Sequence, residues 1–333
     1  MTNRTPEQHD RRQGYLYAAG AFGWWAFIVP SYFRLLSHHG ALPLEVLAQR
    51  VVFGIPLLIV ILMISKRIPD LIRACSSWSS LKILIPSTGL IAINWFFFIY
   101  AVSTDRLNHA SLGYYINPLF SIFLGYLFLG EKLSKLQGLA ILIAAGAVAM
   151  MTVAEFDSGG GVPWIAILLP ASFGLYGLLR KQANVTGTVG ISFEMLVLLP
   201  FCIGLMIWLE QSDKGIFFAT STPIWVSWIM FLGGVITIVP LICFTNAVRL
   251  LPLSTVGLLQ FSAPTGQLLL SAVFFDEPFP PLKFAAFVLI WIAIGVFIRD
   301  LLNTNKARRD SERAIAEQEE KAEHACVDTE MLE

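Results

Sequence analysis

Residues 114–137 read YYINPLFSIFLGYLFLGEKLSKLQ, and residues 260–283 read QFSAPTGQLLLSAVFFDEPFPPLK. In each apolar stretch a proline is followed thirteen residues later by a glutamate: Pro118 by Glu131, and Pro264 by Glu277. Proline breaks or bends a helix and a carboxylate is costly in hydrocarbon, so both are scarce in membrane-spanning segments. Their recurrence at an offset of 146 residues indicates an internal repeat.

The composition indicates an integral membrane protein. Of the 333 residues, 56% are hydrophobic and only 14% are charged, whereas soluble domains carry about 25% charged residues. The formal net charge is zero, so the chain has no overall positive field that would attract nucleic acid. The four cysteines are not spaced as in metal or redox sites, and we expect no metal, cofactor or disulfide.

Ten segments are long and apolar enough to cross a bilayer, which takes about 20 residues of helix. They lie near 14–36, 44–65, 82–102, 109–129, 137–154, 162–180, 193–209, 224–247, 253–275 and 283–302. If the N-terminus is cytoplasmic, 18 of the 23 lysines and arginines fall on the cytoplasmic side and only 3 in outside loops. This asymmetry follows the positive-inside rule. The sequence therefore predicts an all-α integral membrane fold with both termini in the cytoplasm.

The repeat divides the ten predicted helices into two sets of five. Because five is odd, the second set enters the membrane from the opposite side, which makes the two repeats inverted. The expected divisions are a cytoplasmic N-terminal segment (1–13), a first five-helix repeat (14–154), a second five-helix repeat (155–302) and a charged cytoplasmic tail (303–333). Inverted repeats are typical of secondary transporters, whose substrate site lies near the midplane between them. A duplication kept for stability alone is the alternative.

Several long motifs resemble the RarD branch of the EamA family, within the drug/metabolite transporter superfamily. They are LAQR (47–50), NWFFFIYAV (94–102), SLGYYINPLFSIFLGYLFLGEKL (111–133), SFGLYGLLRK (172–181), LPLSTVGLLQFSAPT (251–265) and DEPF (276–279). The resemblance covers about residues 14–302 and implies ten helices in two inverted repeats, a bacterial inner-membrane location and small-molecule permeation. The sequence departs from the family at Gln49, where the resemblance leads us to expect a histidine.

Polar residues inside the predicted spans are candidates for substrate contacts. Arg50 lies about six residues, or roughly 9 Å, inside the second span, where a charge normally faces a cavity or a partner. It is either an anion contact or an outer gate, unless it extends outward to pair with Glu45. The amides fall near mid-depth and either line a polar cavity or join helices: Asn94, Asn117 and Gln260. Aromatic residues expected to line the cavity are Trp24, Tyr115 and Tyr176.

Five further residues are expected to serve gating or structure. Pro118 and Pro264 bend their helices on either side of a central site. Glu194 lies near the start of the seventh span, in the opposite leaflet from Arg50, as an inner counterpart or as a carboxylate that favours a helix N-terminus. Glu131 and Glu277 mark tight turns between helices, and Gly130 with Ser134 and Gln137 predicts a helix end followed by a capping box. No carboxylate is expected at mid-depth.

These features predict a permease that moves a small-molecule metabolite or drug by alternating access. A non-transporting receptor or scaffold is the alternative, and an intramembrane enzyme is less favoured because no nucleophile–base pair or metal motif appears. The sequence also lacks the phosphate-binding loop that direct ATP drive would require. The expected partners are the small-molecule substrate and the lipid bilayer, without nucleic acid, and a homodimer is left open.

Overall fold

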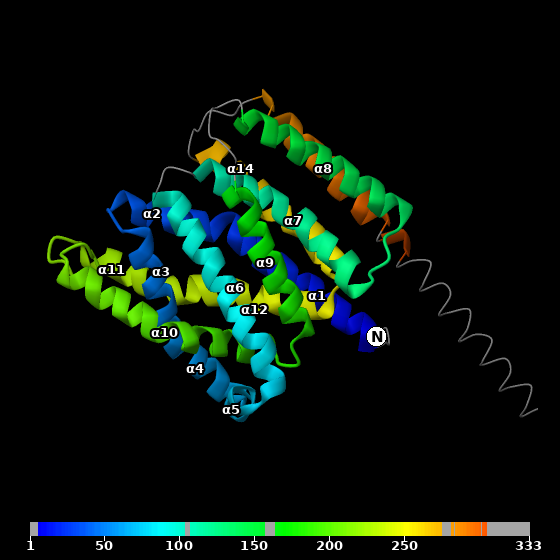
Figure 1. Ribbon diagram of the computed structural model, residues 1–333. Coiled ribbons are helices and arrows are strands. Elements are labelled where there is room, and N and C mark those ends of the chain that lie inside the picture. The colour runs from blue at the N-terminus through cyan, green and yellow to red at the C-terminus, as the bar shows by residue number, and fades with distance from the viewer. Residues whose placement is uncertain are drawn as a thin grey trace, which may run out of the picture.

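The computed structural model describes residues 6–103, 107–156, 164–274, 281–282, 284–300 and 302–304. Throughout these residues the regular elements are helices and none is a strand (Figure 1). The prediction of an all-α fold is therefore confirmed for the described part of the chain.

Seven helical stretches in the described residues are long and apolar enough to cross a membrane. They are Pro43–Ile64, Trp78–Phe98, Leu112–Leu129, Lys135–Val153, Gly187–Gln211, Ile224–Leu250 and Phe284–Thr304. Each coincides with one of the ten expected spans. The other three expected spans also fall on helices, but these are interrupted, less apolar or only partly described.

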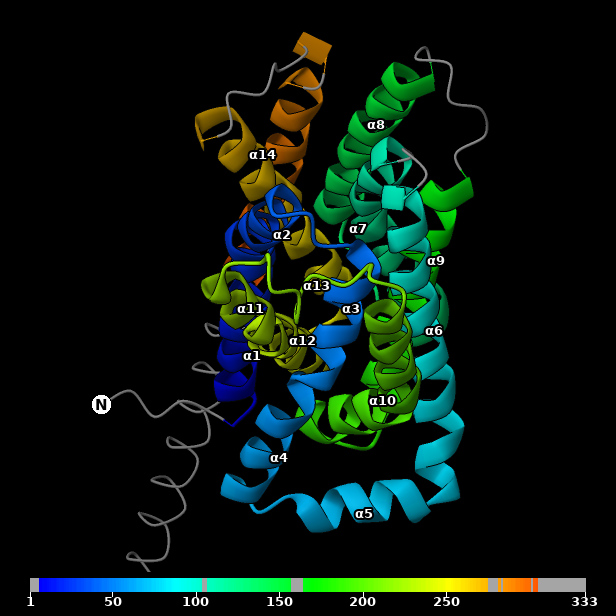
Figure 2. The same cartoon turned by 90° about the vertical axis from the view of Figure 1, so that its left-hand side faces the viewer.

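The first half of the chain begins with a helix that changes its hydrogen-bond register. Its elements are α1 (Pro6–Gly23), the π-helix η1 (Trp24–Ile28), α2 (Val29–His38), α3 (Pro43–Val52), α4 (Gly54–Ile64), α5 (Ile68–Ser76), α6 (Trp78–Ser103), α7 (Leu107–Leu129) and α8 (Lys135–Phe156). The short α5, visible at the bottom of Figure 2, connects the second and third spans and was not predicted.

The second half places its broken helices differently. Its elements are α9 (Trp164–Gln182), α10 (Gly187–Gln211), α11 (Ile224–Phe231), α12 (Gly233–Leu250), α13 (Leu253–Gln260) and α14 (Ser262–Phe274), followed by the helical stretch Phe284–Thr304. Here α9 and α10 are continuous, whereas breaks separate α11 from α12 and α13 from α14.

Prolines account for two of the helix breaks. The α3–α4 break falls at Phe53, three residues before Pro56, and the α13–α14 break falls at Phe261, three residues before Pro264. A proline lacks the N–H that would bond four residues back, and its ring displaces that carbonyl. The expected bend at Pro264 is thus a break between helices, whereas α7 continues through Pro118.

The π-helix has a similar cause. The Val29 N–H bonds to the Trp24 carbonyl, five residues back, and in the same register Pro30 would bond to Trp25 but has no N–H. The free Trp25 carbonyl instead accepts a hydrogen bond of 2.9 Å from the Gln267 amide of α14. A side chain of the second half therefore satisfies a backbone group released in the first.

The three largest of six apolar clusters in the described residues hold most of the helices together. One joins α7, α8 and α13 to the 284–300 segment, and a second joins α1, α6, α9, α12 and α13. The third joins α3 and α4 to α10 and α12. Helices from both halves take part in every cluster, so neither half forms a separate folding unit.

Gly234 of α12 and Gly54 of α4 lie where these two helices cross closely. A β-carbon on Gly234 would lie 2.6 Å from the backbone of Phe53 and Gly54, at the α3–α4 break. Both partners are backbone atoms and cannot move aside as a flexible side chain would. This crossing fixes the position of α12 against the second span.

We predict that Gly234→Ala lowers thermal stability, because overpacking of a tight contact costs about 1–3 kcal/mol. Gly89→Ala is the matched control, since a β-carbon there would meet nothing within 4 Å. Melting of the detergent-solubilised variants measures the difference. Equal melting temperatures for the two variants would contradict the close crossing.

Candidate functional site

The Arg50 side chain lies in a partly aromatic enclosure between α2, α3, α6 and α12. Its Cζ atom lies 5.3 Å from the ring centroid of Phe33 and 5.5 Å from that of Trp95, distances at which a cation is attracted to an aromatic face. Its Nε donates a hydrogen bond to Thr237. Within the described residues Arg50 forms no ion pair with a carboxylate.

Two tyrosines complete this surrounding, which we call the Arg50 centre (Phe33, Trp95, Thr237, Tyr32 and Tyr114). Tyr32 and Tyr114 are close enough to interact electrostatically with Arg50. The Tyr32 hydroxyl is buried and has no hydrogen-bond partner in the described structure. A guanidinium without a carboxylate, next to an unpartnered hydroxyl, can receive an anionic group.

Glu45 does not neutralise Arg50. Its Oε1 atom accepts hydrogen bonds of 2.9 Å from the backbone N–H groups of Ile216 and Phe217, and one of 3.4 Å from Gln49. Glu45 therefore secures the connection between α10 and α11, and the expected alternative of an Arg50–Glu45 pair is wrong.

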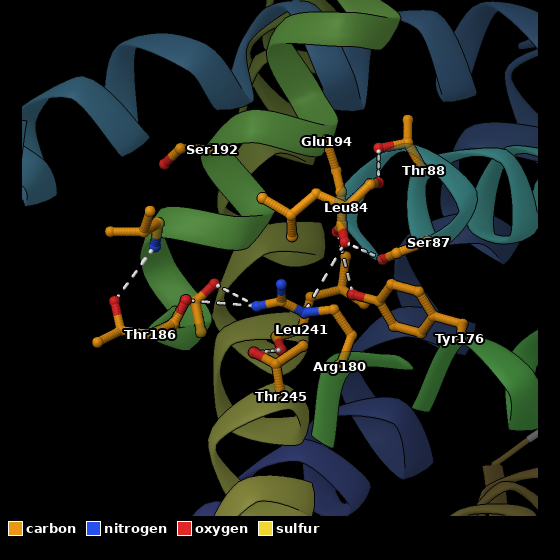
Figure 3. A network of polar contacts seen from close by, with 12 residues as sticks. Leu84, Ser87, Thr88, Tyr176, Arg180, Thr186, Ser192, Glu194, Leu241 and Thr245 are labelled. Carbon is orange, nitrogen blue, oxygen red and sulfur yellow. Dashed lines mark hydrogen bonds and ion pairs between the residues drawn. The ribbon is translucent and has the colours of Figure 1, made fainter. Parts of the chain in front are cut away.

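A second charged cluster surrounds Glu194 on α10 (Figure 3). Its carboxylate accepts hydrogen bonds from the hydroxyls of Ser87 on α6 and Tyr176 on α9, and it lies 3.8 Å from Arg180 Nε. All four side chains are buried. We call these residues the Glu194 centre (Ser87, Tyr176, Arg180 and Glu194).

The Glu194 centre lies deeper than the sequence indicated. Ser87 is nine residues into the span Trp78–Phe98, and therefore near its middle. Trp95 of the Arg50 centre is eight residues further along the same helix, which corresponds to roughly 12 Å. The two centres are thus separated along α6, and the hydrogen bond to Ser87 brings the Glu194 carboxylate beside the middle of a span, where no carboxylate was expected.

Aromatic side chains fill the space near both centres. Trp25 lies 5.9 Å from Phe173 and 5.7 Å from Phe244, measured between ring centroids. Phe173 lies 5.9 Å from Tyr176 of the Glu194 centre. Trp25 and Trp95 both pack against the same two apolar clusters. An apolar part of a bound molecule would meet these rings.

The predicted amides mainly join helices. Asn94 donates to the Leu169 carbonyl at 2.9 Å and to Ser172 at 3.1 Å, which ties α6 to α9. Gln260 accepts a 3.2 Å hydrogen bond from Ser121 and ties α13 to α7. The Asn117 Oδ1 atom is buried without a hydrogen-bond partner in the described structure, so this amide is the one with an acceptor still free.

Glu131 caps a helix of the other half. Its carboxylate accepts hydrogen bonds from the Leu253 N–H (2.6 Å), the Ser254 N–H (2.8 Å) and the Ser254 hydroxyl (2.6 Å) at the start of α13. Lys181 donates to the carbonyls of Val248 and Leu251 at the end of α12. The α12–α13 connection is thereby held at both its amides and its carbonyls.

Comparisons with known proteins agree with this architecture. The model of the EamA-like transporter family matches residues 12–153. An uncharacterized transporter of Vibrio cholerae is 37% identical over 309 residues, covering 92% of this chain and 98% of the relative. The protein RarD of Escherichia coli is 34% identical over 305 residues, covering 89% and 97%.

The chain belongs to the EamA family of transporters. A solved crystal structure of a protein aligns with this EamA transporter at a TM-score of 0.63 and 17% identity, covering 86% of this chain and 97% of the other. At that identity the likeness concerns the fold alone. The expected resemblance to EamA and RarD proteins is thus confirmed, and the protein is a multi-pass membrane transporter.

The structure divides the predicted site residues of this EamA transporter into groups. Arg50 and Tyr176 lie in the two charged centres. Tyr115 packs against Phe287, 5.4 Å between ring centroids, in the cluster with α8. The indole N–H of Trp24 is buried without a hydrogen-bond partner in the described structure. Glu277 lies outside the described residues.

Sequence reasoning missed the partners of both charges. Thr237, Tyr32 and Ser87 are ordinary residues in apolar helices, and nothing in their local sequence marks them. Arg180 does carry a signal, because it lies 146 residues after Arg34, the offset that also relates Pro118 to Pro264. The predicted capping box is confirmed: Ser134 and Gln137 each accept a hydrogen bond from the other's backbone N–H.

We predict that Glu131→Gln destabilises this EamA transporter by about 1–3 kcal/mol, because hydrogen bonds to a charged acceptor are lost at α13. Glu210→Gln, the same change at an exposed position of α10, is the control. Thermal melting in detergent compares the two variants. A substrate ligand at residue 131 would instead alter transport while leaving the melting temperature unchanged.

Proposed function

We propose that this EamA transporter is a secondary transporter, which moves a small-molecule metabolite or drug across the bacterial inner membrane by alternating access. In the proposed architecture ten spans form two inverted repeats. The first contains α1–η1–α2, α3–α4, α6, α7 and α8. The second contains α9, α10, α11–α12, α13–α14 and the stretch Phe284–Thr304.

The observation that carries this proposal is the pairing of interhelical contacts. In the proposed repeats α9 corresponds to α1 and α12 to α6. The contact of α1 with α12 then has its counterpart in the contact of α9 with α6, and both contacts are extensive. The contact of α7 with α9 has its counterpart in those of α13 and α14 with α1 and η1. Such pairing supports two near-equivalent packings that can exchange roles.

The charged centres follow the same correspondence. The Arg50 centre uses the first span (Tyr32), the second (Arg50) and the eighth (Thr237). The Glu194 centre uses the sixth span (Tyr176), the seventh (Glu194) and the third (Ser87). In the proposed repeats these correspond to the first, second and eighth spans, which form the Arg50 centre. Two polar centres related in this way support two repeats that exchange roles around one pathway.

Arg50 is the proposed contact for an anionic group of the substrate, and Asn117 for a neutral polar group. The guanidinium has one hydrogen bond, to Thr237, and no carboxylate partner in the described structure. The neighbouring rings of Phe33, Trp95 and Trp25 would hold an apolar part. This arrangement favours an amphipathic anion over a purely polar one.

The proposed orientation is tested by labelling introduced cysteines with a membrane-impermeant maleimide. We expect Lys132→Cys to react only from the cytoplasmic side and Lys214→Cys only from the outside. Both side chains are exposed, so access to reagent distinguishes the two sides. External labelling at residue 132 would overturn the proposed topology.

Transport is tested by uptake into proteoliposomes of a labelled panel of carboxylates and their uncharged amides. We expect Arg50→Gln to raise KM for a transported carboxylate about ten- to hundredfold, the effect of losing a charged hydrogen bond. Arg73→Gln, which removes an exposed arginine paired with Asp70, is the control.

The outcomes separate the competing functions. Unchanged uptake by both Arg50→Gln and Asn117→Ala would refute the substrate contacts but leave transport intact. Absence of flux across the whole panel would favour a receptor or scaffold. Chemically altered compounds inside the vesicles would favour an intramembrane enzyme.

A further inference from the structure

The Glu194 centre contains a complete charge pair that substrate binding at Arg50 does not use. Glu194 is 2% exposed and Arg180 is fully buried. The two hydroxyl donors, Ser87 and Tyr176, each bond to a different carboxylate oxygen. Both oxygens are therefore occupied, and the carboxylate does not offer a free site for a substrate cation.

Arg180 is only partly satisfied in this arrangement (Figure 3). Its Nη2 atom donates to the carbonyls of Thr186 (3.3 Å) and Gly187 (3.2 Å). Its Nε and Nη1 atoms have no hydrogen-bond partner in the described structure, and Nε lies 3.8 Å from Glu194. Glu194 thus compensates the charge of Arg180 but accepts no hydrogen bond from it. An anion that accepted hydrogen bonds from Nε and Nη1 would satisfy this guanidinium more fully than Glu194 does.

The guanidinium is held in place by the shape of α10. A β-carbon on Gly190 would collide with the Arg180 guanidinium, so a glycine is required for the arginine to reach this position. A buried charge is stable only while a counter-charge remains nearby. Whatever removes the charge of Glu194 must therefore bring another anion to Arg180 or expose it to water.

A polar cavity lies at the C-terminal end of α9, directly after Arg180 in the sequence, at the end of the bundle expected to face the cytoplasm; neither Arg180 nor Glu194 lines it. It has a volume of about 510 Å³ and is lined in part by Gln13, Tyr17, Lys181, Asn184, Asn246 and Arg249. Arg249 is half-buried, interacts electrostatically with Arg180 and Arg67, and forms no ion pair in the described structure. The cavity therefore gathers positive charge, from Lys181 and Arg249, at the end of α9 that carries Arg180.

We propose that Glu194 is a proton-binding site and that Arg180, together with Arg249, forms the anion subsite which this proton controls. A proton from water adds to one carboxylate oxygen, and the Ser87 or Tyr176 hydroxyl turns to accept from it. Arg180 then loses its internal counter-ion and takes an external anionic group in its place. A proton and an anion consequently bind together. This inference rests on the proposed transport function and adds a coupling site to it.

The charges facing Glu194 support this coupling. Around Glu194, α9 contributes Arg180 and Tyr176, and α6 contributes only the neutral Ser87. On α5, which packs against α10, Asp70 and Arg73 pair with each other. Arg249 of α12 and Arg67 before α5 add positive charge beside Arg180. On α3, Glu45 bonds to the connection after α10, and Arg50 bonds to Thr237. No second carboxylate in the described structure replaces Glu194 as the counter-ion.

Infrared difference spectroscopy on the purified full-length protein tests the proton site without any transport measurement. We expect a protonated-carboxyl band to appear as the pH is lowered in the wild type and in Glu210→Gln, and to be missing in Glu194→Gln. Tyr176→Phe, which keeps the carboxyl, should retain the band but move its midpoint to higher pH, because it removes a donor to the charged form. A band that Glu194→Gln leaves unchanged would overturn the proposal.

The anion subsite is tested in the same titration, with benzoate as the probe and benzamide as its neutral control. Because linkage is reciprocal, an anion coupled ten- to hundredfold should raise the midpoint by about one to two pH units at saturation. Benzamide should have no effect, and Arg249→Gln should reduce the shift. An unchanged midpoint with benzoate, acetate and phosphate would overturn the anion subsite, whether or not the protein transports these compounds.

Discussion

The structure depends on one constraint: a charge held among membrane helices has to be compensated close to where it lies. Lipid cannot compensate such a charge, so hydroxyls, aromatic faces, carbonyls or an opposite charge must compensate it. Arg50 donates a hydrogen bond to Thr237 and lies against two aromatic rings. Arg180 lies near Glu194 and donates to two backbone carbonyls. The helices around each arginine are placed by these requirements as much as by apolar packing.

The same constraint applies to the backbone. Prolines release carbonyls, and helix ends release N–H groups, neither of which lipid can satisfy. The structure meets these needs across the two halves: Gln267 bonds to the carbonyl at Trp25, and Glu131 bonds to the amides that begin α13. Each released group becomes a link between the halves, and interruptions of a helix thereby strengthen the connection between them.

Much of the fold could be predicted because it follows from local properties. Hydropathy located the seven stretches of the described residues that are long and apolar enough to cross a membrane, and the spacing of Ser134 and Gln137 predicted their helix cap. The recurring Pro264 and Glu131 correctly indicated a break and a connection. The π-helix was not predictable, since it depends on Pro30 together with a distant glutamine. The partners of Arg50 and Glu194 were not predictable either, because they come from helices far apart in sequence and consist of ordinary hydroxyl and aromatic residues.

The depth of Glu194 shows why position along a helix is a poor guide to position in the bundle. It is the eighth residue of α10, yet it bonds to the middle of the α6 span because the helices cross at different heights. The two centres therefore match in geometry but differ in charge. The Glu194 centre compensates itself, whereas the Arg50 centre has an arginine without a carboxylate in the described structure. If the halves exchange roles during transport, the two exposed states cannot be equal in energy without a bound anion or proton, and that inequality is what a transporter needs to couple movement to its ligands.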